Sequence, residues 1–144
     1  MNDVTGARSP AWFRIVAVLA VLWNLIGVWQ YLSYVGVVPM MREMTPQEAS
    51  LIGGAPVWYT AAFAIAVFAG FIGAIGLVLA RAWARPVLIV SLVALILQFT
   101  WWCFLSGAAD VLGPSVYTAP AVVVLVGILL VWLAGTGVKR GWLR

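Results

Sequence analysis

Histidine is absent from this chain of 144 residues, and cysteine occurs once, as Cys103. A single cysteine excludes a disulfide bond within the chain and a metal site built from several cysteines. Charged residues are equally scarce, at 8% of the chain, whereas a soluble domain carries about a quarter. So few charges could not cover the surface of a soluble domain, and the chain is therefore predicted to lie in a membrane.

Catalytic chemistry also lacks its usual parts. The acidic residues are confined to the N-terminal tail and two loops and do not cluster as metal ligands would; they are Asp3, Glu43, Glu48 and Asp110. The central half of each apolar run holds no ionisable residue, so general acid–base catalysis, zinc hydrolysis and nucleophilic triads have no candidate residues. No basic residue lies near Cys103 in the sequence to stabilise a thiolate. We expect no enzymatic activity, no metal ion and no cofactor.

Four apolar runs are present instead, and each is long enough to cross a bilayer core of roughly 30 Å, which takes ~20 helical residues. They cover residues 12–35, 57–80, 86–105 and 116–134. The first run exceeds the ~7–15 apolar residues of a signal peptide and has no clear small-residue cleavage site after it. The sequence therefore predicts an all-α, four-helix transmembrane bundle that forms one domain over residues 1–144.

The basic residues are distributed unevenly about these runs. Seven of the eight precede the first run, separate the second from the third, or follow the fourth: Arg8, Arg14, Arg81, Arg85, Lys139, Arg140 and Arg144. The positive-inside rule places that side, with both termini, in the cytoplasm. Because the net charge of +4 is dispersed around the apolar runs, membrane topology explains it better than a nucleic-acid partner does.

The longest connection, between the first two runs, contains "TPQEASLIGG". Thr45 is a suitable N-cap, Pro46 fits the first helical position, and Glu48 completes a capping box. Gly53 and Gly54 are expected to end this short helix. It is predicted to lie flat on the outer face, either as a lid or as a simple connector.

A six-residue pattern occurs twice, as "PVWYTA" from Pro56 and "PSVYTA" from Pro114. From the tyrosine of each pattern, the first basic residue on the opposite side lies 22 positions on. These features favour two related helix hairpins, residues 11–81 and 82–144, arranged as parallel repeats about the membrane normal. Interfacial tyrosine, first-turn proline and a terminal basic residue also have generic explanations, so coincidence remains an alternative.

Three carboxamide side chains lie inside apolar runs: Asn24, Gln30 and Gln98. Counted from the arginine at the start of each run, Arg14 or Arg85, Gln98 lies between the other two in depth, about 4–5 Å from each along the membrane normal. A carboxamide exposed to lipid tails would leave its polar atoms unpaired, so all three are expected to face the bundle interior. This polar centre would either bond helix to helix or bind a small polar solute. In the second case Trp23, Trp29 and Trp101 are candidate stacking walls, although Trp101 is equally explained as an interfacial anchor.

The second run carries small residues on one face. They are Ala62, Ala66, Gly70, Gly73, Ala74 and Gly76. Small residues at this spacing allow helix backbones to approach closely. The stripe is predicted to pack against another helix, either within the bundle or in a second protomer.

Several longer stretches occur in a recognisable order: "LWNLIGVWQYL", "PVWYTAAFAIAVFAGFIG", "RAWARPVLIVSL" and a final "GWL". Among them, Trp23-Asn24, Gly27, Pro56, Trp58 and Arg81 are the most distinctive positions. In this order, from Leu22 to Leu143, the chain resembles a family of short four-helix bacterial membrane proteins whose members often carry the label "sugar transporter". The resemblance implies a multi-pass protein of the bacterial inner membrane.

Two functions compete on this basis. The first is an uncoupled permease for a small polar, sugar-like solute that acts as a homo-oligomer, because the spans lack the ionisable residues that proton coupling needs and four helices enclose little volume. The second is an accessory or scaffold subunit that docks on another membrane protein through the small-residue face. Lipid binding at the outer aromatic rim is a third hypothesis.

Overall fold

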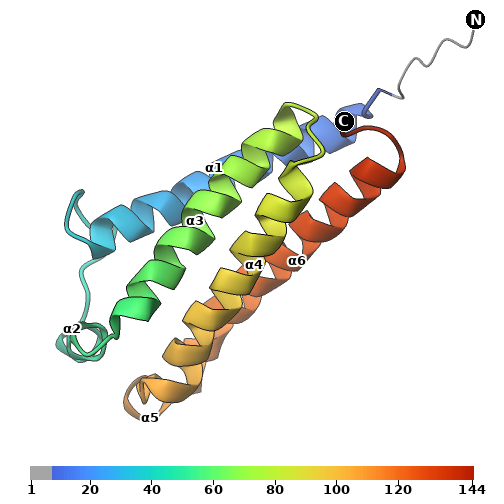
Figure 1. The fold of residues 1–144 in the computed structure, drawn as a ribbon. Coiled ribbons are helices and arrows are strands. Elements are labelled where there is room, and N and C mark those ends of the chain that lie inside the picture. Colours follow the sequence, from blue (N-terminus) through green and yellow to red (C-terminus); the bar gives the residue numbers. More distant parts are fainter. Residues whose placement is uncertain (1–7) are drawn as a thin grey trace, which may run out of the picture.

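The protein is all-helical over residues 8–144, the part of the chain that its computed structural model describes (Figure 1). Four helices are long and apolar enough to cross a membrane, and the described residues form no β-strand. These helices are α1 (Ala11–Tyr34), α3 (Val57–Val78), α4 (Ala84–Thr100) with its continuation η1 (Trp101–Leu105), and α6 (Thr118–Lys139). The predicted all-helical class, with four helices long and apolar enough to cross a membrane, is thereby confirmed. Residues 1–7, with Asp3, lie outside the described part.

The observed helix ends follow from local chain chemistry. The first three spans agree closely with the predicted runs 12–35, 57–80 and 86–105, whereas α6 extends five residues beyond the predicted end at residue 134. Hydropathy falls near that point, but the helix stops only where Gly141 takes a left-handed conformation, with φ of 73°. There the Trp142 N–H donates to the Gly137 carbonyl at 2.8 Å, the bond of a Schellman cap.

The connection between α4 and α6 is helical as well. The last turn of the third span widens to a π-helix, η1, and a short helix, α5 (Ala108–Leu112), follows it. The glycines on either side of α5 make the reversal possible, because Gly107 has φ of 75° and Gly113 has φ of 85°, which most residues adopt only with strain. From the sequence, the residues between the third and fourth apolar runs were expected to form a loop.

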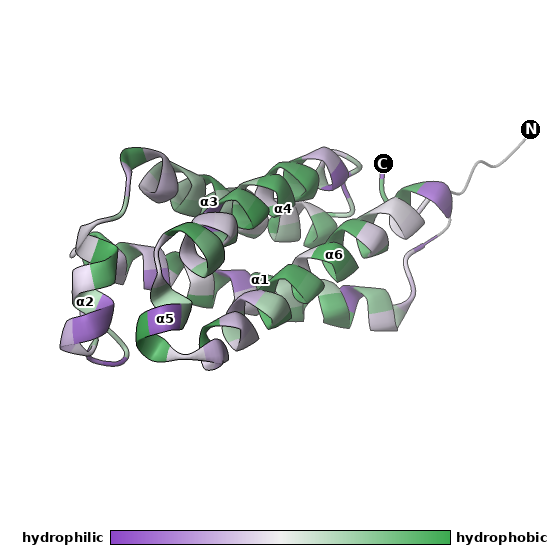
Figure 2. Ribbon diagram, turned by 90° about the horizontal axis from the view of Figure 1, so that it is seen from below, coloured by the Kyte–Doolittle hydropathy of each residue, from purple (hydrophilic) through white to green (hydrophobic). Residues whose placement is uncertain are grey.

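The short helix α2 (Pro46–Gly53) forms where the capping box predicts it. The Glu48 N–H donates to Thr45 Oγ1 at 3.2 Å, and the Thr45 N–H donates to Glu48 Oε2 at 2.8 Å. These two bonds satisfy backbone donors that the first turn of a helix leaves free. Both α2 and α5 carry hydrophilic segments at one end of the bundle, while the long helices are mainly hydrophobic (Figure 2).

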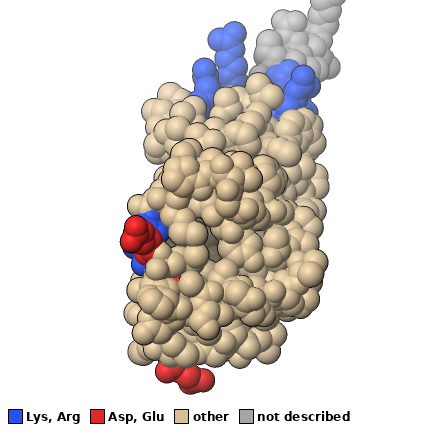
Figure 3. Space-filling view, turned by 90° about the vertical axis from the view of Figure 1, so that its left-hand side faces the viewer, with Lys and Arg blue, Asp and Glu red and all other residues tan. Residues whose placement is uncertain are grey.

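Charge separates the two ends of the molecule. We call one the basic end; it holds Arg8, Arg14, Arg81, Arg85, Lys139, Arg140 and Arg144. We call the other, with α2 and α5, the acidic end; it holds Glu43, Glu48, Asp110 and the remaining base, Arg42. Figure 3 shows blue side chains gathered at the top of the molecule and acidic ones at its left and lower edges.

The helices pack in the order α1, α3, α4, α6, with α3 and α4 in the most extensive contact. Helices α1 and α6 meet at the basic end, where a Cβ built on Gly137 of α6 would lie 3.2 Å from the Phe13 ring. The Phe13 ring also packs against Trp142 in the tail after α6, at 5.3 Å between centroids. The buried apolar core lies in this half of the bundle and includes Phe13, Leu77, Leu88, Leu133 and Leu143. The basic half is therefore closed by close-packed side chains.

The structure does not show the predicted repeat of residues 11–81 and 82–144. Pro56 is the N-cap of α3, whereas Pro114 opens a separate 3₁₀ turn, η2 (Pro114–Tyr117), before α6 begins. A two-fold repeat would also pair α1 with α6 as α3 pairs with α4. Instead, α3 and α4 pack closely while α1 and α6 share few contacts beyond the basic end.

The predicted small-residue stripe lies on α3 and is buried inside the bundle. All six of its residues are buried. A Cβ built on Gly73 would lie 2.7 Å from the Leu88 side chain, and one on Gly76 would lie 2.9 Å from Ala84 Cβ, so α4 covers this part of the stripe. The stripe therefore packs helices within one chain, and the docking surface that the accessory-subunit hypothesis invoked is already covered.

Candidate ligand-binding site

Gln98 is the centre of the candidate site. It lies near the C-terminal end of α4, three residues before the π-helix η1 begins. Only 3% of its surface is exposed. Its Oε1 is the one buried side-chain polar atom that lacks a hydrogen-bond partner among residues 8–144. Leaving a buried carbonyl unpaired costs roughly 1–3 kcal/mol. A hydrogen-bond donor from a ligand or from water would remove this cost.

Gln98 lines a cavity of about 270 Å³, which we call the Gln98 cavity. One wall is α1, with Trp23, Ile26 and Gln30, and the opposite wall is α4, with Leu95, Gln98 and Phe99. Helix α3 closes the base, and Val123 of α6 completes the lining. The cavity thus fills the space that opens between α1 and α6 once they diverge from the basic end.

Tyr59 connects this cavity with two others at the acidic end. The Arg42 cavity, of about 250 Å³, lies under the loop after α1, and the Glu48 cavity, of about 460 Å³, lies between α2 and the start of α6. Tyr59 lines all three. It is 6% exposed, and its ring packs against that of Trp101, with the centroids 4.7 Å apart and the ring planes tilted by 54°. The buried side chain of Tyr59 is therefore shared by the linings of all three cavities.

Asn24 lies apart from Gln98. Its Nδ2 donates to the Ala20 carbonyl of its own helix at 2.8 Å, and its Oδ1 packs against Gly70. It lines a smaller hollow of about 70 Å³, the Asn24 cavity, together with Ser91. The Ser91 hydroxyl donates across to the Ala66 carbonyl of α3 at 2.6 Å. The hydrogen bond of Asn24 therefore stays within α1, whereas Ser91 makes the bond that joins α4 to α3.

The expectation that all three amides point inward is wrong for Gln30. Gln30 is exposed on α1, although it borders both the Gln98 cavity and the Arg42 cavity. The cause is helical geometry: Asn24 and Gln30 are six residues apart, which rotates their side chains by roughly 240° around α1. The structure brings Gln30 and Gln98 to one cavity and leaves Asn24 in the next.

The three tryptophans also separate. Trp23 lines both the Gln98 cavity and the Asn24 cavity, and Trp29 lines only the Arg42 cavity. Trp101 is buried behind Tyr59 and supports the site through that ring. Only Trp23 is therefore a wall of the Gln98 cavity in the sense that the sequence predicted.

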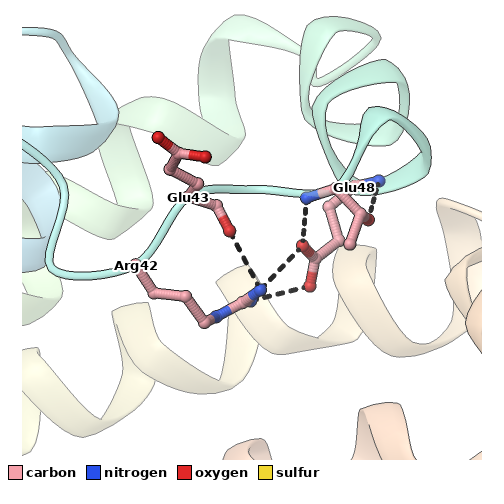
Figure 4. Close-up of polar contacts among 4 residues, drawn as sticks. Arg42, Glu43 and Glu48 are labelled. Carbon is pink, nitrogen blue, oxygen red and sulfur yellow. Dashed lines mark hydrogen bonds and ion pairs between the residues drawn. The ribbon is translucent and has the colours of Figure 1, made fainter.

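The helix α2 lies at the acidic end, and an ion pair links it to the loop that precedes it. The Arg42 guanidinium donates to both carboxylate oxygens of Glu48, at 2.8 and 3.2 Å, and to the Glu43 carbonyl (Figure 4). The hydrogen bond from Arg42, followed by that from the Thr45 N–H, lowers the pKa of Glu48 from 4.5 to about 2. The same pair raises the pKa of Arg42. Because both residues belong to the connection between α1 and α3, the pair stabilises this segment internally and does not join α2 to a long helix.

The sequence analysis missed two residues that line the Gln98 cavity, Tyr59 and Phe63, and one that lines the Asn24 cavity, Ser91. It assigned Tyr59 to the interfacial aromatic belt, and it did not single out Phe63 or Ser91. Ser91 carried a usable signal, since a hydroxyl in the middle of an apolar run needs a partner. Phe63 carried none, because a phenylalanine facing lipid and one facing a cavity look alike in sequence.

The described residues contain no group of three or more histidine, cysteine, aspartate or glutamate side chains that could hold a metal ion. The lining of the Gln98 cavity offers a ligand apolar contacts and a few neutral hydrogen-bonding groups. Comparison with known proteins found no matching family model, no matching curated protein and no matching solved structure. The resemblance to small four-helix bacterial membrane proteins thus rests on the quoted sequence motifs alone.

Proposed function

We propose that this chain is a multi-pass protein of the bacterial inner membrane that binds a small uncharged ligand in the Gln98 cavity. The observation that carries the proposal is the unpaired Oε1 of Gln98, buried to 3% exposure beside a cavity. This oxygen exposes less than 1 Å² of its surface, so a ligand O–H or N–H would satisfy it once the Gln98 side chain turns toward the cavity. The proposed role involves no catalysis, since no nucleophile or acid–base pair borders the cavity.

The lining defines the class of ligand. Side chains that can hydrogen-bond are few: Gln30, Tyr59, Gln98 and, through its indole N–H, Trp23. The remaining walls are aliphatic and aromatic, including Phe63 and Phe99. A polyhydroxylated sugar would leave most of its hydroxyl groups unpaired here, at a cost for each. A compact molecule with an apolar body and one donor group fits this lining better.

Entry is expected from the acidic end or from the bilayer. Tyr59 joins the Gln98 cavity to the two hollows under α2, and the exposed residues Ile26 and Gln30 border its other side. The basic half is closed by the apolar core. We propose that the acidic end faces outward, in keeping with the positive-inside rule.

Uncoupled permeation is the second candidate, and one observation favours it. The Asn24 cavity shares Trp23, Gly27 and Val123 with the Gln98 cavity, so a line of hollows with polar groups leads toward the basic end. It stops at the core residues Leu88 and Leu130. A passage would require the core to open, and a homo-oligomer is one arrangement that could provide the missing volume.

Phenol and toluene test the binding proposal, because both have an apolar ring and only phenol has a donor. Each is titrated into the purified protein while ligand-observed NMR follows binding. The wild type should bind phenol about tenfold more tightly than toluene, as one hydrogen bond to a buried acceptor predicts. Gln98→Leu should remove this preference and raise the unfolding temperature. Gln47→Leu, a change at an α2 position that borders none of these cavities, should alter neither.

Equal binding of phenol and toluene by the wild type would contradict the proposal. Permeation is tested separately by the swelling of proteoliposomes in glycerol and in xylitol. If swelling is the same with wild type, Gln98→Leu and empty liposomes, the chain is no polyol permease. The mass of the detergent-solubilised protein then distinguishes a homo-oligomer from a complex with other chains.

A further inference from the structure

A further hollow lies at the opposite, basic end and is lined by arginines. This arginine pocket has a volume of about 540 Å³. Arg8 and Arg14 flank the start of α1, Arg81 lies in the turn between α3 and α4, and Arg144 is the last residue of the tail after α6. Three segments that are distant in the sequence thus contribute four exposed arginines to the lining of one pocket.

Backbone contacts fix this arrangement. The Arg144 N–H donates to the Ala80 carbonyl at 3.0 Å, and the Ala82 N–H donates to the Arg144 carbonyl at 2.8 Å. Leu143 anchors the tail, since it is 4% exposed and packs against Gly137 of α6. The tail is therefore bound to the α3–α4 turn by its main chain, and substitution of the Arg144 side chain leaves these bonds in place.

No aspartate or glutamate side chain of the described residues lines the pocket. The one ion pair over residues 8–144 joins Arg42 and Glu48 at the acidic end. The other acids of that range, Glu43 and Asp110, lie at the acidic end too. Four like charges around one space repel one another, so an anion in it would be attracted strongly.

The chemistry of the lining indicates which anion. Guanidinium groups form paired hydrogen bonds with phosphate oxygens, and arginine is the residue that most favours this geometry. The rest of the lining is apolar or aromatic, with Val78, Leu79 and Trp142. Trp142 is in turn stacked by Arg140, whose guanidinium carbon lies 5.3 Å from the ring centroid. A phosphate next to an apolar body suits such a surface, and basic pockets at the ends of membrane helices are known sites for phospholipid headgroups.

We propose that the arginine pocket binds a phosphate group, with Arg81 and Arg144 as its principal ligands. A phosphodiester of an anionic lipid and a soluble phosphate compound share this chemistry. The position of the pocket at the end of the membrane helices favours the lipid. This inference is independent of the ligand proposed for the Gln98 cavity, because the closed core separates the two sites.

Thermal unfolding in a neutral detergent tests the proposal. Phosphatidylglycerol is compared with phosphatidylcholine, and inorganic phosphate is compared with chloride at equal ionic strength. Phosphatidylglycerol should raise the unfolding temperature of the wild type in a saturable manner. The double variant Arg81→Gln/Arg144→Gln should bind it about tenfold or more weakly. The matched control Arg85→Gln/Lys139→Gln removes two charges from the same end but outside the pocket, and it should bind as the wild type does.

Each alternative outcome has a defined meaning. If inorganic phosphate stabilises the wild type and phosphatidylglycerol adds nothing, the phosphate site stands and its source is soluble. If the control variant loses the effect as fully as the pocket variant, or if phosphatidylglycerol acts no differently from phosphatidylcholine, the proposal is overturned. Arg81→Lys/Arg144→Lys keeps the charge and loses the forked geometry, so an intermediate affinity for this variant gives a second check that does not depend on neutral side chains.

Discussion

The side-chain oxygen of Asn24 occupies the space that a Cβ on residue 70 would need. A Cβ built on Gly70 would overlap Asn24 Oδ1 and would come within 3.0 Å of Ser91 Oγ. One glycine of α3 therefore receives a polar side chain from α1 on one side and from α4 on the other. This contact sets how closely three helices approach in the middle of the bundle.

Gly70→Ala should therefore destabilise the protein by about 1–3 kcal/mol, the range for forcing an extra carbon into a packed interior. Unfolding by SDS in mixed micelles gives the measurement. Gly53→Ala is the control, since a Cβ on Gly53 meets nothing within 4 Å. The combined variant Asn24→Ala/Gly70→Ala should recover part of the loss, and a loss no larger than that of the control would refute the contact.

The C-terminal caps of α3 and α6 should respond in opposite directions to substitution. Ala80 holds φ of 56° where Gly141 holds 73°, and only glycine adopts this region without strain. Ala80→Gly should stabilise the protein by roughly 0.5–1 kcal/mol and Gly141→Ala should destabilise it by about 1 kcal/mol. The same unfolding assay checks both. A destabilising Ala80→Gly would show that the alanine methyl group makes a contact more valuable than the strain it causes.

The acidic end should show a specific pH dependence. Because the pKa of Glu48 is lowered from 4.5 to about 2 in the folded chain, its ion pair with Arg42 contributes fully above pH 4.5 and is lost as the pH falls through about 2. The contribution to stability is small, since the pair is largely open to solvent. NMR titration of the Glu48 carboxyl carbon measures this pKa.

Arg42→Gln should raise the pKa of Glu48 toward its ordinary value, because the Arg42 hydrogen bond is the largest cause of the shift. Thr45→Ala should raise it less, since the backbone N–H of residue 45 still donates. If Glu48 titrates identically in Arg42→Gln and wild type, the ion pair does not form in solution.

Side-specific labelling tests the proposed orientation. In a Cys103→Ala background, single cysteines are placed at Ser50 of α2 and at Ser9, which precedes α1. A membrane-impermeant maleimide applied to intact bacterial cells with a permeabilised outer membrane should label Ser50→Cys. It should label Ser9→Cys only after the inner membrane is opened. The reverse pattern would place the basic end outside, against the charge rule.

Much of the fold was determined by the sequence itself. The four spans follow from run length and hydropathy, and their bounds agree closely except at the end of α6. The helix α2 follows from Thr45, Pro46 and Glu48, whose side chains act on backbone groups only three residues away. Charge placement likewise gave the separation into a basic and an acidic end. These features depend on chemistry that is local along the chain.

Only the tertiary structure decided which side chains meet. In a membrane, residues that face lipid are as apolar as residues that face the core, so the spans carry no pattern that separates inside from outside. For that reason the sequence could not tell buried Gln98 from exposed Gln30. The meeting of three cavities at Tyr59 and the gathering of Arg81 and Arg144 in one pocket depend on how α1, α3, α4 and α6 pack, because their partners lie dozens of residues apart in the chain.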